Sequence, residues 1–153
     1  MERLRSIITA LAFSLILLLV GVVASPANTI DSPTPEEVVQ SELMQDLTSE
    51  SVTLQKQAMR RIRAYAHTGR YNKAIFDNLV GPLHDIVAHG YTKEIRLVAL
   101  SALDAIGSDA AMAGLQVQQG TLSSDLVRNA TETVLARHAA EEADSSRQIR
   151  TAE

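Results

Sequence analysis

Hydrophobic side chains recur every three or four positions along most of the chain after residue 34. This spacing places them on one face of a helix, so it predicts a run of short amphipathic helices. Residues 34–37 read Thr-Pro-Glu-Glu, which puts Thr at the N-cap, Pro at the first helical position and Glu at the third. We therefore expect the first helix over about residues 35–47.

Serine and threonine residues mark further helix starts, and glycines mark helix ends. Gly81-Pro82 interrupts one long helical region. Because proline has no N–H for the helix ladder, we expect a kink or a junction between two helices there. The predicted later helices cover about residues 51–68, 72–89, 93–106, 109–119 and 124–141.

One hydrophobic pattern occurs three times, with a small alanine between two larger side chains. The copies begin at residues 54, 95 and 126, so their offsets are 41 and 31 residues. Stacked helix pairs bury a continuous core and leave an extended groove. The pattern predicts an all-α fold, a short α-solenoid of antiparallel helix pairs with about three repeats and an N-terminal capping helix. Its members are Leu54, Ala58 and Ile62, then Ile95, Ala99 and Leu103, then Leu126, Ala130 and Val134.

Residues 94–111, which read EIRLVALSALDAIGSDAA, resemble a HEAT repeat of the short type also found in phycobilisome-lyase-related proteins. The resemblance covers about residues 51–138, is good over this central repeat and is degenerate in the other two. The repeat around residue 126 has its arginine one place late, and the one around residue 54 lacks it. The resemblance implies a structural role for Arg96, which would tie neighbouring repeats together through carboxylates.

The N-terminus has the order of a secretory signal. Arg3 and Arg5 precede an almost entirely apolar stretch over residues 7–23, and small residues follow up to Ala24. We expect residues 1–24 to be a signal peptide that is cleaved after Ala24, which makes the protein periplasmic or extracellular. The alternative is an uncleaved anchor, since seventeen helical residues span about 26 Å. In either case the remainder lies outside the cytoplasm.

The rest of the chain divides into three predicted parts. Residues 25–34 are polar and contain proline, which indicates a linker. Residues 35–141 form the repeat domain. Residues 142–153 are polar, and we expect them to be a flexible tail.

Composition excludes several classes of function. The chain has no cysteine, which rules out disulfides, thiolate metal sites and thiol nucleophiles. Its net charge of −4 makes it a poor candidate for nucleic-acid binding. Aromatic residues make up only 3%, so the core must be built mainly from aliphatic side chains and alanine.

No catalytic, cofactor-binding or metal-binding motif is present. Four carboxylates could in principle pair for acid–base chemistry, but no two of them fall in a recognisable motif; they are Asp77, Asp85, Asp104 and Asp109. His84 and His89 are five residues apart, which does not place them on one helical face. We interpret the histidines as capping or surface residues; they are His67, His84, His89 and His138.

Two sets of residues are candidates for contact with a partner. Lys56, Arg60 and Arg63 form a basic stripe on one helix face. Such a stripe indicates a site for an acidic partner or for anionic lipid headgroups or, more simply, a solvated face. A groove along the second helix of each pair would use other anchors, namely Leu83, Asp85 and Met112.

The leading hypothesis is thus an exported, non-catalytic interaction or scaffold module that binds a protein through a helix-lined groove. The alternative is a membrane-tethered structural protein that associates with copies of itself. An enzyme with a dispersed active site ranks third. The membrane would be contacted only through an uncleaved N-terminal segment.

Overall fold

The computed structural model describes residues 32–151. The predicted signal peptide and most of the predicted linker lie outside these residues. All regular structure in the described part is helical, as the hydrophobic pattern predicts, and none of its helices is long and apolar enough to cross a membrane. The α-helices are α2 (Pro35–Leu47), α3 (Val52–Thr68), α4 (Asp77–His89), α5 (Lys93–Ile106), α6 (Asp109–Gln119) and α7 (Asp125–Thr151), and a short 3-10 helix, η1 (Lys73–Phe76), precedes α4.

Local sequence fixes most of the helix ends. Thr34 Oγ1 accepts a hydrogen bond from the Glu37 N–H at 3.2 Å, and Glu37 Oε2 accepts one from the Thr34 N–H at 2.7 Å, which forms the expected capping box. Gly69 and Gly107 end α3 and α5 in the left-handed conformation, with φ of 59° and 57°. Only glycine adopts this conformation at no steric cost, so these two residues act as the predicted stop signals.

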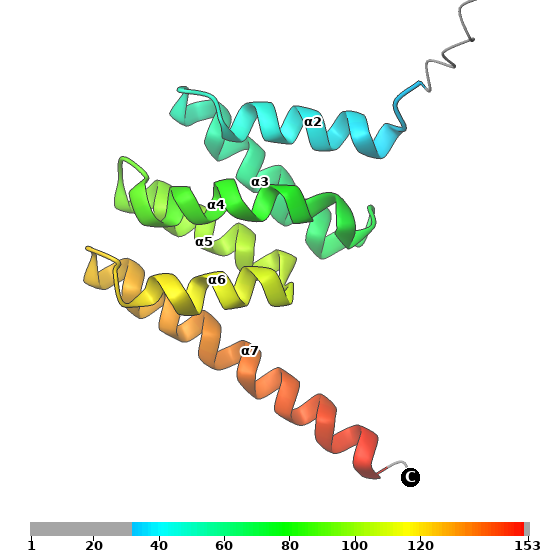
Figure 1. Ribbon diagram of the computed structural model, residues 1–153, viewed down its shortest axis with the longest axis vertical. Helices are drawn as coiled ribbons and strands as arrows, with labels where there is room; N and C mark the ends of the chain where they lie inside the picture. The colour runs from blue at the N-terminus through cyan, green and yellow to red at the C-terminus, as the bar shows by residue number, and fades with distance from the viewer. Residues whose placement is uncertain (1–31, 152–153) are drawn as a thin grey trace, which may run out of the picture. The chain divides into compact units, whose positions relative to one another are not determined.

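The helices form two rows (Figure 1). One row consists of α2, α4 and α6, and the other consists of α3, α5 and α7. Across the rows, α2 packs on α3, α4 on α5 and α6 on α7. The three turns that join these pairs lie along one side of the molecule, which we call the turn edge; it comprises residues 48–51, 90–92 and 120–124.

The core between the rows is aliphatic. Ala58 and Ala99 have no exposed surface, which lets neighbouring helices approach closely at these points. Phe76 is the one phenylalanine in the core cluster of the described residues. The largest fully buried side chains are Phe76, Leu43, Leu47, Met59, Ile62, Leu79, Leu83, Ile95, Leu103, Ile106, Leu115 and Val87.

The burial predicted for the first and third copies of the repeat pattern is partly wrong. Leu54 is 39% exposed, and Val52 in the same turn packs against the core instead. Leu126 is 54% exposed, whereas Val127 is fully buried and Ala130 is only partly buried. The buried face of α7 therefore begins one residue later than the pattern indicates, because Val127 also satisfies a helical period with the later core positions.

Helix α4 runs through Pro82 without ending, so of the two alternatives expected at Gly81-Pro82, a kink or a junction, the junction is wrong. The clash that normally keeps the residue before proline out of the α conformation involves its Cβ, and Gly81 has none. Pro82 leaves the carbonyl of Asn78 without its helix partner, but Asn78 is exposed and water can hydrogen-bond that oxygen. The boundary within this region lies earlier, where η1 gives way to α4 at Asp77.

Helix α7 is longer than predicted. It continues to Thr151 instead of ending near residue 141, so most of the expected flexible tail is helical. Residues 125–151 contain neither glycine nor proline, and Arg147 pairs with Asp144 one turn away. Figure 1 shows the second half of α7 projecting away from both rows, and the side chains of residues 139–150 are all exposed.

Candidate functional site: a polar pocket at the ends of α3 and α5

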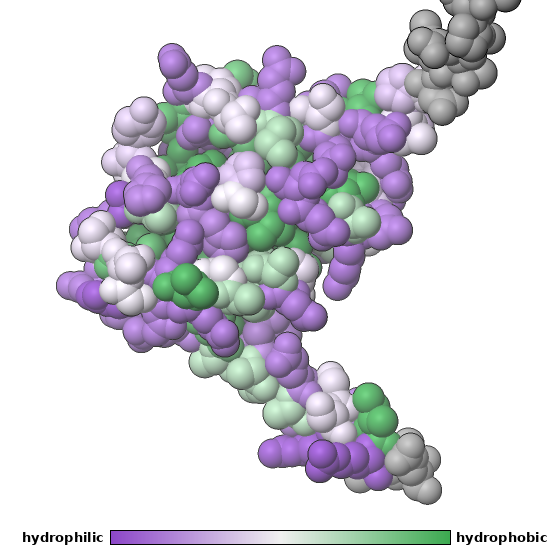
Figure 2. Space-filling view, viewed as in Figure 1, coloured by the Kyte–Doolittle hydropathy of each residue, from purple (hydrophilic) through white to green (hydrophobic). Residues whose placement is uncertain are grey.

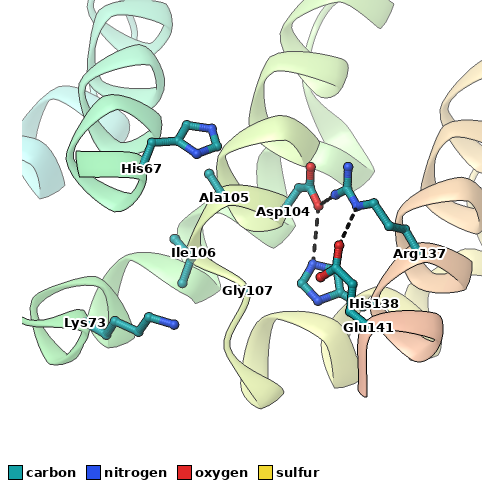
Figure 3. A pocket seen from close by; sticks show the side chains of 9 residues that line it. All are labelled: His67, Lys73, Asp104, Ala105, Ile106, Gly107, Arg137, His138 and Glu141. Carbon is teal, nitrogen blue, oxygen red and sulfur yellow. Dashed lines mark hydrogen bonds and ion pairs between the residues drawn. The ribbon is translucent and has the colours of Figure 1, made fainter. Parts of the chain in front are cut away.

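A pocket of about 480 Å³ lies at the ends of α3 and α5 that point away from the turn edge (Figure 1), and Figure 3 shows it from close by. It forms where the C-terminal ends of α3 and α5 meet η1 and the middle of α7. We call it the polar pocket. Its lining residues are His67, Lys73, Asp104, Ala105, Ile106, Gly107, Arg137, His138 and Glu141.

Asp104 is the centre of the polar pocket. Its carboxylate Oδ1 accepts a hydrogen bond from the Arg137 guanidinium and lies 3.3 Å from His138 Nε2. The hydrogen bond with Asp104 raises the pKa of Arg137 above its usual value. Arg137 Nε also lies 3.7 Å from Glu141 Oε1, so these side chains form a connected network that ties α7 to the end of α5.

Gly107 brings His138 into this network. A Cβ at Gly107 would lie 3.2 Å from His138 Cε1, and the positive φ of Gly107 already disfavours any other residue. The side chain of His138 is 19% exposed, so the ring is held between the end of α5 and the rest of α7. The turn after α5 thus positions a histidine that is distant in sequence.

His67 and Lys73 complete the pocket from the other side, and both are exposed. Figure 3 shows the His67 ring directed toward Ala105, and the Lys73 side chain extending toward the end of α5. Within the part of the chain that the structure describes, neither side chain forms an ion pair. They are therefore available to a ligand or partner.

The polar pocket is lined mainly by charged and hydrogen-bonding side chains. Its lining includes neither serine, threonine nor cysteine, so a histidine–carboxylate pair here has no hydroxyl or thiol to activate. Residues 32–151 contain no group of three or more side chains suited to hold a metal ion. What the pocket offers is a preformed set of hydrogen-bond donors beside carboxylates that are already paired.

The predicted groove anchors do not form a common site. Leu83 is fully buried, so its prediction as a partner contact is wrong: α4 turns this face toward the core. Met112 is half-buried and packs against the core cluster. Asp85 is exposed and lines a smaller hollow of about 210 Å³ near the turn edge. Figure 2 shows mainly hydrophilic residues on the face that carries α2, α4 and α6, with hydrophobic ones in small separate areas.

The basic stripe on α3 mostly contacts α5. Lys56 Nζ lies 2.8 Å from Glu94 Oε1, and the hydrogen bond from Lys56 lowers the pKa of Glu94 below its usual value. Arg63 donates a hydrogen bond to Ser101 Oγ at 3.3 Å. Arg60 is exposed. Two members of the stripe therefore join neighbouring helices of one row.

Arg96 links two turns of the turn edge. Its Nε donates to the Gly90 carbonyl oxygen at 2.7 Å, and its Nη1 donates to Ser123 Oγ at 3.2 Å. These acceptors are a carbonyl and a hydroxyl, so the carboxylate partners that the resemblance implies are not the ones found. A structural position for Arg96 remains, since it connects the α4–α5 turn to the α6–α7 turn.

His84 is buried, which corrects its interpretation as a capping or surface residue. It is 8% exposed and its Nδ1 lies 3.2 Å from Gln118 Oε1 on α6. Gly114 provides the space for the ring, because a Cβ there would lie 2.3 Å from His84 Nε2. Gly114 lies inside the helix predicted over residues 109–119, and a glycine at such a position indicates a close contact with a neighbouring element. This was the sequence signal for the contact with His84.

Sequence reasoning missed the polar pocket because its residues come from separate repeats. Asp104 was considered for acid–base chemistry, but no neighbour in sequence explained it. The offset of 31 residues between the last two copies would place residue 135 level with Asp104, within one turn of Arg137 and His138. Aligning the last two copies of the pattern in this way would have indicated that Asp104 lies near Arg137 and His138.

Comparison with known proteins adds no relatives: no family model, no curated protein and no solved structure matches the chain. The likeness to HEAT repeats therefore stays a prediction based on the residues themselves.

Proposed function

We propose that this chain is an exported interaction module, built from helix pairs similar to HEAT repeats, that binds a protein partner at the polar pocket. Two features of the described residues support the repeat interpretation. The helices alternate between two rows, and the alanines at the same step of the pattern in α3 and α5, Ala58 and Ala99, are both fully buried.

The polar pocket is the observation that carries the proposal. Its internal charges already pair with one another, so Asp104 and Arg137 stay in place without a ligand. Lys73 and His67 remain at its rim without ion pairs, and the exposed second half of α7 extends the surface beyond them. A prearranged polar surface of this kind loses little side-chain freedom when a partner binds.

Site-specific crosslinking tests the proposal. Replacing Lys73 with photoreactive benzoylphenylalanine puts the probe at the rim of the polar pocket, and the same replacement at Gln116, exposed on α6, is the matched control. We expect a discrete adduct in the cell envelope from position 73 and none from position 116. Arg137→Glu in the position-73 protein should remove most of that adduct, because it puts a carboxylate against Asp104.

Mass spectrometry of the adduct separates the alternatives. A second, different polypeptide supports the interaction module. An adduct of twice the chain mass would instead indicate self-association. Equal adducts from positions 73 and 116, or an adduct that Arg137→Glu leaves unchanged, would show that the polar pocket is not the contact site.

A further inference from the structure

A second hollow, of about 420 Å³, lies at the turn edge beside the start of α7. We call it the turn-edge hollow. It shares no residue with the polar pocket, so a function of this hollow can be tested independently of the proposed function. Its lining residues are Tyr91, Lys93, Arg96, Ser123, Ser124, Asp125 and Leu126.

Ser124 is the unusual residue of this hollow. It is only 9% exposed, and its Oγ is buried without a hydrogen-bond partner. Its carbonyl accepts the hydrogen bond from the Arg128 N–H at 2.9 Å, which places Ser124 at the N-cap of α7. A buried hydroxyl that makes no bond costs free energy, so an absent acceptor or donor is expected at this position.

The N-caps of other helices show what Ser124 lacks. The side chains of Ser51, Thr92 and Ser108 accept hydrogen bonds from the first-turn N–H groups of α3, α5 and α6. Ser124 Oγ makes no such bond, so it leaves the first-turn N–H groups of α7 uncapped. These N–H groups and the positive end of a 27-residue helix both favour an anion.

Two cationic side chains line the same hollow. Arg96 is held in place by its bonds to the Gly90 carbonyl and Ser123 Oγ, which use two of its five N–H groups. Lys93 is exposed at the first position of α5. One carboxylate, that of Asp125, also lines the hollow and forms an ion pair with Arg128. Lys93, Arg96 and Asp125 together carry a formal charge of one positive unit, which matches a monoanion better than a dianion.

The rim of the turn-edge hollow includes two large side chains with apolar surface. Tyr91 is 84% exposed and Leu126 is 54% exposed. Their position beside an anion-binding helix end suits a ligand with a charged group and an apolar body.

We infer that the turn-edge hollow binds a carboxylate group attached to an apolar body. The carboxylate would accept hydrogen bonds from Ser124 Oγ, from the first-turn N–H groups of α7 and from Arg96, while the apolar body rests on Tyr91 and Leu126. Such a group occurs both in small organic acids and at the C-terminus of a peptide with an apolar last residue, and the two share the same recognition chemistry.

A titration followed by NMR tests the inference on the ¹⁵N-labelled full chain. N-acetyl-leucine supplies the carboxylate and N-acetyl-leucinamide is its uncharged match. We expect saturable shifts of the amide signals of residues 125–127 with the acid and none with the amide. A peptide ending in a free leucine carboxylate is the third probe: tighter binding than the acid assigns a peptide C-terminus, and equal binding assigns a small organic acid.

Ser124→Ala is the decisive variant, with Ser41→Ala on the exposed face of α2 as its control. Because Ser124 Oγ is buried and makes no bond within the protein, its removal should keep or raise the unfolding midpoint while weakening acid binding about tenfold. Lys93→Ala should weaken binding about two- to fivefold, less at high salt. Ser41→Ala should bind as the unchanged chain does.

Three results would overturn the inference. They are equal shifts with the acid and the amide, unchanged binding by Ser124→Ala, and tighter binding of inorganic phosphate than of the carboxylate. The last would show that charge alone governs the hollow.

Discussion

At the residue scale, the contact between His84 and Gly114 shows how one missing side chain shapes the packing of two helices. The His84 ring occupies the space where a Cβ of residue 114 would be, and it is bonded to Gln118 on the same helix. Glycine in a helix interior normally costs up to about 1 kcal/mol relative to alanine, so its presence in α6 needs a packing reason. The buried ring is that reason.

We expect Gly114→Ala to destabilise the protein by about 1–3 kcal/mol, because the added Cβ displaces a buried ring that has no free space to move into. The gain in helix propensity offsets only part of this. Urea unfolding followed by circular dichroism measures the change. Gly120→Ala, with nothing within 4 Å of the added Cβ, is the control and should be neutral or slightly stabilising. An equal stabilisation by both variants would refute the packing argument.

The burial of individual residues was the feature least predictable from the sequence. Leu83 and Met112 looked like surface anchors because a helical repeat was expected to expose its second helices. Both in fact face the core cluster. Helix α4, which carries Leu83, packs on α2, α5 and α6, and helix α6, which carries Met112, packs on α4, α5 and α7. Periodicity identifies the apolar face of a helix, but which neighbours cover its borders depends on the tertiary packing.

At the element scale, helix starts and ends followed from local chemistry, and helix lengths did so less well. Thr34, Thr92 and Gly107 fixed their boundaries through caps that involve only nearby residues. The end of α7 carries no such signal, so polarity alone suggested a tail where a continuous helix forms. Local sequence did not indicate the polar pocket for a related reason, because Asp104 and Arg137 meet only when α5 and α7 pack.

The Lys56–Glu94 ion pair connects α3 to α5, and its strength should depend on pH. The pKa of Glu94 is lowered in the folded chain by the hydrogen bond from Lys56. A carboxylate with a lowered folded pKa stabilises the protein above its unfolded pKa, and this contribution disappears as the pH falls through the folded value.

We therefore expect Glu94→Gln to melt slightly lower than the unchanged chain at pH 7 and at the same temperature near pH 3. The effect at pH 7 should also shrink at high salt, because the Glu94 side chain is exposed to solvent. Thermal melts at the two pH values measure it. Gln57→Glu on the exposed surface of α3 is a useful comparison that alters charge without touching the pair. A difference that persists at pH 3 would contradict the assignment to this carboxylate.

At the scale of the whole molecule, two rows of helices account for the described residues, and the all-helical class was correctly predicted from hydrophobic spacing. The repeated pattern predicted buried positions correctly where a helix is covered on both sides, as at Ala99 in α5. It was less accurate at the ends of the row. Among the helices of residues 32–151, α7 packs mainly on α5 and α6, so its buried face is narrower.

Export is the prediction at this scale. We expect the protein from an envelope or secreted fraction to begin at Ser25, because small residues precede the predicted cut and Pro26 follows one place after it. N-terminal sequencing or intact mass measures this. A protein that keeps residues 1–24 and sediments with membranes would support the anchor instead, and one that stays in the cytoplasm would contradict both.

The exposed ring of Tyr91 has an experimental consequence. The chain has no tryptophan and three tyrosines, so tyrosine dominates its ultraviolet fluorescence. Tyr65 and Tyr71 stack edge to face with ring centres 5.0 Å apart at the far end of α3, whereas Tyr91 stands alone at the surface. Tyr65→Phe together with Tyr71→Phe would leave one natural fluorophore, which reports occupancy of the adjacent hollow without any attached dye.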